Sequence, residues 1–262
     1  MLSDFYRGIA YVPQGFQLLT ARGLRRFVLL PIAVNVLVFA ALFWLGTSWF
    51  HAFLMWLLPS TTLSQHSGIF GQLLTFLEVI VRWLLWPLFL LAAVAIIFYT
   101  FTALANLIGS PFNSMLSARV EQHATGRFPP EAPKGAGLLV ESVKAVVDEL
   151  RKIAYFALLG IPLLILFVIP VVQIAAPFLW GLYGAWIIAL EYVDYPLGNR
   201  GISFRDQWRI TRERRLLHLG FGAGVLCMTI IPFVNLVAMP TAVIGATLLQ
   251  ADLRNRVVPE AA

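Results

Sequence analysis

Long stretches without any charged residue alternate along this chain with short islands that hold nearly all of its charge. Asp, Glu, Lys and Arg are absent from residues 27–77, 83–118, 153–190 and 216–251, where apolar side chains dominate. A water-soluble domain of this length cannot bury so many apolar residues, whereas a bilayer solvates them. The pattern therefore predicts an all-α integral membrane protein, because a membrane segment must satisfy its backbone hydrogen bonds internally.

The first half of the chain predicts two long transmembrane helices. Residues 27–59 would form a helix of roughly 50 Å, which exceeds the roughly 30 Å hydrocarbon core, so this helix must tilt or project. The polar residues 60–68 are typical of a loop. A second helix is expected over residues 69–110, ended by Gly109-Ser110-Pro111, because Gly and Pro are helix-stop signals.

The second half predicts two helical hairpins, over residues 153–190 and 216–251. Each stretch is too long for one ordinary crossing, and its halves are near or below the length of a full span. Prolines break both stretches: Pro162, Pro170 and Pro177 in the first, and Pro232 and Pro240 in the second. Half-penetrating hairpins fit the short arms best, and two thin full crossings are the alternative.

Basic residues set the topology through the positive-inside rule. Four Lys or Arg precede residue 27, six lie in residues 112–152, six in 191–215 and two in 252–262. Between residues 27 and 111 there is only Arg82. All the basic islands face the cytoplasm only if each late stretch returns to its starting side, as a hairpin does.

The remaining segments complete a single membrane domain over residues 1–262. They are an N-terminal interfacial segment (1–26) with a helix over 5–19, cytoplasmic segments over 111–152 and 191–215, and a tail over 252–262. Residues 138–152 have apolar side chains at helical spacing with charges between them, which predicts an amphipathic surface helix.

The two hairpin stretches share a short sequence pattern. Ile169-Pro170-Val171-Val172-Gln173-Ile174 resembles Ile231-Pro232-Phe233-Val234-Asn235-Leu236. Apolar sequences match easily by chance, so duplication and coincidence both stay open at this point. A true duplication would place Gln173 and Asn235 at equivalent hairpin tips, as in transporters whose repeats build a site near the midplane.

Patterns that indicate catalysis or a cofactor are absent from the sequence. It contains no H-E-x-x-H zinc motif, no Walker A loop and no G-x-S-x-G elbow, and its four histidines are widely separated. The single cysteine, Cys227, excludes an intramolecular disulfide and a multi-cysteine metal site. Basic membrane flanks explain the net charge of +6, so nucleic acid is not an expected partner. We therefore expect no enzyme, no catalytic residue, no cofactor and no metal.

The first candidate site is Arg22-Gly23-Leu24-Arg25-Arg26, directly before the first long helix. One interpretation is an anchor, because arginines snorkel to the membrane interface and set orientation. The other is an anion site, in which unpaired N–H groups at a helix N-terminus and paired guanidiniums hold a tetrahedral dianion. Gly23 would let the oxyanion approach the backbone closely.

The second candidate is the segment Glu191-Tyr192-Val193-Asp194-Tyr195-Pro196-Leu197-Gly198-Asn199, where the first hairpin leaves the membrane. It is interpreted either as a structured exit turn or as a gate, in which Glu191 or Asp194 pairs with Arg25 or Arg119. Amides and charges near membrane depth form a third group, which would join helices or line a polar path. The candidate pore or gate residues are Asn35, Asn106, Asn113, Arg119, Glu121, Glu191, Asp194, Asn199 and Asn235. Glu78 and Arg82 have the i, i+4 spacing of a structural ion pair.

With these motifs the chain resembles the CysZ-type sulfate permeases of bacterial inner membranes, over nearly its whole length. The residues that carry the resemblance are Gly23-Leu24-Arg25-Arg26-Phe27 with Leu29-Leu30-Pro31-Ile32 and Asn35, Ser110-Pro111-Phe112-Asn113, and Leu190-Glu191-Tyr192-Val193-Asp194-Tyr195-Pro196 with Asn199 and Ser203-Phe204-Arg205. The string from Glu191 to Pro196 is its most specific element.

The resemblance implies a multi-pass inner-membrane protein that takes up sulfate for cysteine biosynthesis without hydrolysing ATP. It implies two long membrane helices with half-penetrating hairpins, assembly as a homo-oligomer in the lipid bilayer, and sulfate held by the Gly23 and Leu24 backbone with the Arg25 and Arg26 side chains. Sulfite and related oxyanions are not separated from sulfate by the sequence. A channel, a proton-coupled oxyanion transporter and a non-transporting membrane scaffold or regulator stay open as functions.

Overall fold

The structure, a computed structural model, describes residues 2–57, 69–130 and 138–257. Every regular element in these ranges is helical: eight α-helices and two short 3₁₀ helices, with no strand among them. The prediction of an all-α membrane protein is confirmed. In the same ranges, Ala176–Gly198 and Val234–Arg256 are long and apolar enough to cross a membrane. The chain divides into two compact units, Leu30–Ser110 and Met1–Leu29 with Pro111–Ala262.

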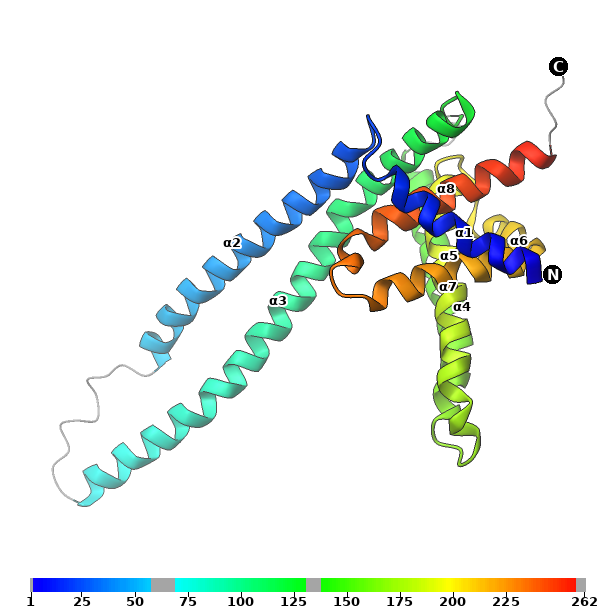
Figure 1. Cartoon of the computed structure of the whole chain (residues 1–262). Helices are drawn as coiled ribbons and strands as arrows, with labels where there is room; N and C mark the ends of the chain where they lie inside the picture. Colours follow the sequence, from blue (N-terminus) through cyan, green and yellow to red (C-terminus); the bar gives the residue numbers. More distant parts are fainter. Residues whose placement is uncertain (1, 58–68, 131–137, 258–262) are drawn as a thin grey trace. The chain divides into compact units, whose positions relative to one another are not determined.

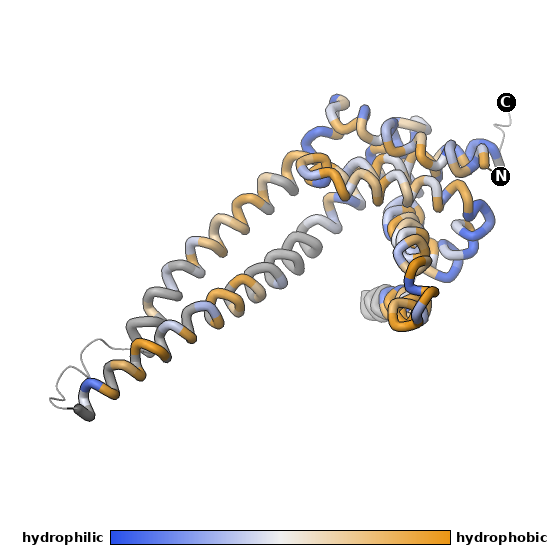
Figure 2. The backbone as a smooth tube through the Cα atoms, turned by 60° about the horizontal axis from the view of Figure 1, so that its bottom comes forward, coloured by the Kyte–Doolittle hydropathy of each residue, from blue (hydrophilic) through white to orange (hydrophobic). Residues whose placement is uncertain are grey.

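The unit Leu30–Ser110 holds most of α2 (Arg25–Leu57) and the N-terminal part of α3 (Ile69–Thr125). Large apolar side chains on both helices are exposed, including Trp49 and Trp83, at 76% and 77%. Figure 2 shows the hydrophobic colour recurring along both long tubes. Two long helices are confirmed here; the expected loop over 60–68 lies outside the described residues, as do the side chains of Glu78 and Arg82.

The expected end of the second helix at Pro111 is wrong, because α3 continues as a helix to Thr125. Beyond the proline, Asn113, Leu116, Ser117, Val120 and Glu121 recur at helical spacing and are 4% exposed or less. A proline inside a helix costs about 3 kcal/mol, whereas burying Leu116 and Val120 returns about 1.5–3 kcal/mol each. Packing of this face therefore outweighs the local helix-stop signal.

Two helical hairpins form as predicted. The first joins α4 (Leu138–Leu166), the 3₁₀ helix η1 (Val172–Ile174) and α5 (Ala176–Gly198), and the second joins α7 (Arg215–Ile230), η2 (Val234–Val237) and α8 (Ala238–Val257) (Figure 1). The expected break at Pro162 is wrong, because α4 runs through it without interruption and also includes the separate surface helix expected over 138–152. An apolar stretch keeps its helix because its backbone groups have no water to bond to in lipid. The expected exit turn after residue 190 is also helical, since α5 continues to Gly198, with Val193 and Leu197 in the core.

The two hairpin tips have the same backbone conformation. Val171 has φ 70° and ψ −48°, and Phe233 has φ 65° and ψ −43°. In each tip the next N–H donates to the proline carbonyl two residues earlier, Val172 to Pro170 at 2.9 Å and Val234 to Pro232 at 2.8 Å. Both are strained γ-turns with a non-glycine residue at positive φ. This shared geometry supports a duplication and makes Gln173 and Asn235 structurally equivalent.

The second unit has its core where α1 (Leu2–Leu18) packs on α7 and α8, with α5 against both. Phe221, at 0% exposure, lies at the centre of this core. Glycines allow the close approach: a Cβ at Gly8 would collide with the Leu217 carbonyl, and one at Gly222 with the Ala185 carbonyl. The helix expected near the N-terminus is confirmed, and it is packed into the core rather than only resting at an interface. A further helix, α6 (Phe204–Glu213), connects the two hairpins.

Candidate functional site

The loop between α1 and α2 leaves backbone donors free in front of a helix. Gly23 has φ +94°, in the left-handed region that favours glycine, and open space where a side chain would lie. The N–H groups of Leu24 and Arg25 donate to the Ala21 carbonyl at 3.1 and 3.3 Å. Among the described residues, the Gly23 and Arg26 N–H groups have no acceptor. The loop therefore offers a ligand two free donors at the positive end of α2.

A concave pocket of about 490 Å³ opens beside this loop. Its lining residues are Arg22, Gly23, Leu24, Arg26, Arg119, Gln122, His123 and Gly126. The loop forms one wall and the last turns of α3 form the other, and all of these residues belong to one unit. The lining contains three arginines and no carboxylate. The Arg25 side chain is exposed and does not line the pocket, whereas Arg22 does.

Two of the pocket arginines are held by neutral groups. Arg26 lies over the Phe27 ring at 4.9 Å, and Arg119 lies over the Phe128 ring at 5.0 Å. Arg119 also donates to Gln122 Oε1 at 3.2 Å. Within the described part of the chain, none of the three pocket arginines has a carboxylate within ion-pair distance. Aromatic faces and an amide orient the Arg26 and Arg119 guanidiniums without neutralising them, so their charge is available to an anion.

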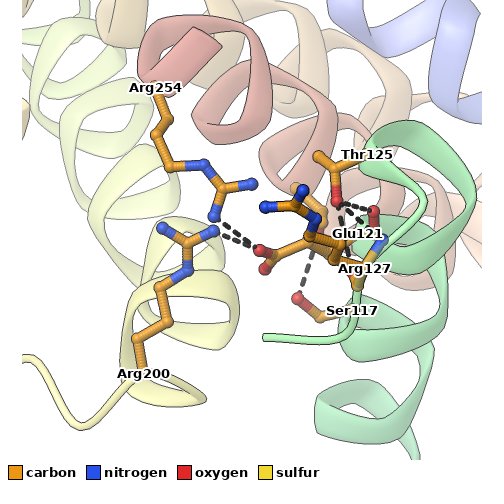
Figure 3. A network of polar contacts seen from close by, with 7 residues as sticks. Ser117, Glu121, Thr125, Arg127, Arg200 and Arg254 are labelled. Carbon is orange, nitrogen blue, oxygen red and sulfur yellow. Dashed lines mark hydrogen bonds and ion pairs between the residues drawn. The ribbon is translucent and has the colours of Figure 1, made fainter. Parts of the chain in front are cut away.

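Glu121 does not line the pocket and joins α3 to two other elements. It is 2% exposed and accepts from Arg200, which follows α5, and from Arg254 on α8 at 2.9 Å (Figure 3). Ser117, one turn earlier, shares a 2.9 Å hydrogen bond with Thr247 of α8. Burial raises the pKa of Glu121, and the charge of Arg254 opposes that shift. Glu121 thus fixes the turn of α3 that presents Arg119 and Gln122 to the pocket.

Of the two carboxylates in the second candidate, Asp194 has other partners than predicted. Asp194 accepts from Lys152 of α4 at 3.3 Å and from Gln207 of α6 at 2.7 Å. The expected pairing of Asp194 with Arg25 or Arg119 is wrong, because helical continuation of α5 turns this side chain toward α4 and α6. Glu191 is exposed and has no ion pair with a described residue.

Two of the candidate amides join helices. Asn113 donates to Tyr195 Oη at 3.2 Å, and Asn199 donates to the Ser114 carbonyl at 2.8 Å, so both tie α5 to α3. Asn235 is exposed at the second hairpin tip. The side chains of Asn35 and Asn106 lie outside the described ones.

Sequence reasoning did not identify the second wall of the pocket. Gln122, His123 and Gly126 were not singled out, and Arg119 was considered only as a gate. Gly126 has φ +71° directly after α3, the usual position of a helix-terminating glycine. The presence of this glycine was a signal in the sequence for the end of α3.

Comparison with known proteins gives consistent matches over both units. The family model described as sulfate transporter CysZ/etoposide-induced protein 2.4 matches residues 11–240. The chain is 40% identical over 243 residues to the sulfate transporter CysZ of Pseudomonas aeruginosa, covering 92% of this chain and 93% of that protein. It is 37% identical over 244 residues to the protein of that name from Pseudomonas fluorescens, covering 92% and 91%. For Salmonella typhimurium the identity is 35% over 246 residues, covering 94% and 92%.

Proposed function

This chain belongs to the sulfate transporter CysZ/etoposide-induced protein 2.4 family, and on that premise we propose that it is a sulfate permease of the bacterial inner membrane. The observation that carries the proposal is the pocket lined by Arg22, Arg26 and Arg119 without a carboxylate. Sulfate is proposed as the substrate because the chain resembles the sulfate transporters of Pseudomonas and Salmonella. Sulfite and related oxyanions of similar size are further candidate substrates.

The pocket suits a small tetrahedral dianion. A guanidinium presents a planar fork of donors to two oxygens at once, and the free Gly23 N–H adds a backbone donor. A hydrogen bond between charged groups contributes about 1.5–3 kcal/mol, so a few such bonds hold sulfate against its strong hydration. A monoanion of similar size gains about half the Coulomb energy from the same guanidiniums.

The membrane potential limits the mechanism. Moving a dianion inward against 100 mV, negative inside, costs about 4.6 kcal/mol, so an open channel alone would leave internal sulfate roughly 2,000-fold below external. We propose a channel whose inward flow is maintained because sulfate is consumed inside for cysteine biosynthesis, without ATP hydrolysis. Proton-coupled transport is the second candidate. A pH gradient that accumulates sulfate in vesicles without internal consumption would favour it.

The proposed arrangement in the membrane follows from helix lengths. As long apolar helices, α2 and α3 are expected to cross fully, with Asn35, Asn106 and Asn235 as candidate pore residues. At 16 residues, α7 is roughly 24 Å long, which is short of the hydrocarbon core and favours a half-penetrating second hairpin. Assembly as a homo-oligomer would complete a pore around such hairpins.

Labelled sulfate flux into proteoliposomes tests the proposal. We expect wild-type flux and its loss in the Arg22→Gln/Arg26→Gln variant at equal incorporation. Arg127→Gln is the matched control, because Arg127 is exposed and outside the pocket lining. Flux that survives the double substitution would leave a transporter but refute the pocket. A wild type that carries no sulfate would favour the scaffold or regulator.

A further inference from the structure

We propose that α6 and the start of α7 form a binding surface for anionic phospholipid headgroups, independent of the sulfate pocket. The surface, called here the α6 basic face, consists of five exposed arginines: Arg205, Arg209, Arg212, Arg214 and Arg215. Its only acidic neighbours on the same short segment are Asp206 and Glu213. The segment Arg205–Arg215 therefore has a net charge of about +3.

These arginines lack the carboxylate partners that the structure gives to six other basic residues. In the described part of the chain, Arg7, Arg151, Lys152, Arg200, Arg254 and Arg256 all form ion pairs with carboxylates. None of the five arginines of the α6 basic face has a carboxylate within 4 Å among the same residues. An uncompensated cluster of this size on an amphipathic helix attracts anionic lipid.

The opposite side of α6 fixes the helix to the hairpins. Gln207 and Thr211 are 3% and 0% exposed, and Gln207 donates to Asp194 at 2.7 Å and to the Ile202 carbonyl at 2.9 Å. The Ser203 hydroxyl caps the helix by accepting from the Asp206 N–H. The arginines are thus displayed by a docked helix rather than by a free loop.

Chain connectivity places this face beside the bases of the two hairpins. The segment connects the end of α5 to the start of α7, which are the bases of the two hairpins, while the far tips expose Val171 and Phe233 at 80% and 86%. If the apolar tips enter the bilayer, the bases lie at its surface. The Trp208 ring lies edge-on to Tyr155 and beneath the Arg212 guanidinium at 4.9 Å, and such Trp and Tyr pairs favour the membrane interface.

Native mass spectrometry of the detergent-solubilised protein tests this assignment. The protein is titrated with phosphatidylglycerol and, separately, with phosphatidylcholine of the same chains. We expect the wild type to retain phosphatidylglycerol preferentially, and each removed arginine to weaken retention by up to roughly fivefold at low salt. Arg205→Gln/Arg209→Gln/Arg212→Gln should abolish the preference, whereas the corresponding lysine triple variant should keep it. Glu213→Gln, on the same helix, should strengthen it.

The outcomes separate the lipid from other anions. Preference that survives the glutamine triple variant would overturn the proposal, as would equal loss in the glutamine and lysine variants. Preferential retention of a short single-stranded RNA over phosphatidylglycerol would assign the surface to a different partner. Inorganic phosphate at matched ionic strength should not displace the lipid; displacement would indicate a simple phosphate site. Sulfate flux in the triple variant is recorded separately, so failure here leaves the proposed transport function standing.

Discussion

Replacing Glu121 with glutamine is expected to destabilise the unit that carries the pocket by about 2–3 kcal/mol. Removing one partner of a buried ion pair costs about 3–5 kcal/mol, because the other charge stays buried and unpaired. The Arg200 and Arg254 side chains are 18% and 35% exposed, so water can reach both guanidiniums in part, which reduces that figure. At about 2–4 °C per kcal/mol for a chain of this size, the unfolding midpoint should fall by roughly 4–12 °C.

The assay is the fraction of monodisperse protein that remains after heating in detergent, measured by size-exclusion chromatography. The control is Glu149→Gln, because Glu149 pairs with Lys152 at 2.8 Å but is 58% exposed and should contribute under about 1 kcal/mol. The triple variant Glu121→Met/Arg200→Met/Arg254→Met should restore much of the midpoint, since apolar side chains need no buried partner. A Glu121→Gln variant as stable as the control would refute this role of the Glu121 ion pairs. Sulfate binding should weaken in parallel, because α3 supplies one pocket wall.

Three further predictions concern the pocket, a hairpin tip and the N-terminal helix. Arg22→Gln should weaken equilibrium binding of labelled sulfate by roughly tenfold or more, and Arg25→Gln by much less, because Arg22 lines the pocket and Arg25 does not. Equal effects of the two substitutions would contradict this prediction. Val171→Gly should raise the unfolding midpoint by roughly 2–4 °C, since glycine relieves about 1 kcal/mol of strain at φ 70°, and a lower midpoint would argue against strain. Burial raises the pKa of Tyr11 to about 12, and so does the Asp252 carboxylate, which accepts a hydrogen bond from the Tyr11 hydroxyl at 2.6 Å. Unfolded tyrosine ionises near pH 10, so the raised pKa contributes about 2–3 kcal/mol to the free energy of unfolding below pH 10, and this contribution is lost as pH rises through 12. The unfolding midpoint of Tyr11→Phe should therefore fall less at alkaline pH than that of the wild type.

Local sequence signals were sufficient to predict the long apolar helices and the two hairpins. Charge-free stretches indicated where helices could be buried in lipid, and Pro170 and Pro232 do lie in the tips that reverse the chain. The same residue type misled at Pro111 and Pro162, where the helix continues. A proline lowers local helix stability by a similar amount everywhere, but the compensating burial of Leu116 and Val120 depends on α3 packing against distant helices. That term has no local signature.

Only one of the two pocket walls could be predicted from the sequence, because the other depends on contacts between distant parts of the chain. Gly23 and its neighbouring arginines form a contiguous motif, so one wall could be proposed from adjacent residues. The other wall is brought there by the tertiary fold, through contacts such as Glu121 with Arg254 across 133 positions. Asp194 shows the converse error: its charge suggested an arginine partner, but extension of α5 places it beside Lys152 and Gln207.

Ionic strength should separate the structural arginines from the functional ones. Arg200 and Arg254 meet a carboxylate that is 2% exposed, and salt screens such buried pairs weakly. The pocket arginines and the α6 basic face form no ion pair with a described carboxylate and are accessible to solvent. Their attraction for anions therefore weakens as the Debye length falls from about 10 Å at 0.1 M to about 3 Å at 1 M. High salt should therefore lower sulfate affinity and phosphatidylglycerol preference while the unfolding midpoint changes little. If the unfolding midpoint fell together with both binding signals, the unpaired arginines would also stabilise the fold. The absence of a carboxylate partner would then not distinguish functional arginines from structural ones.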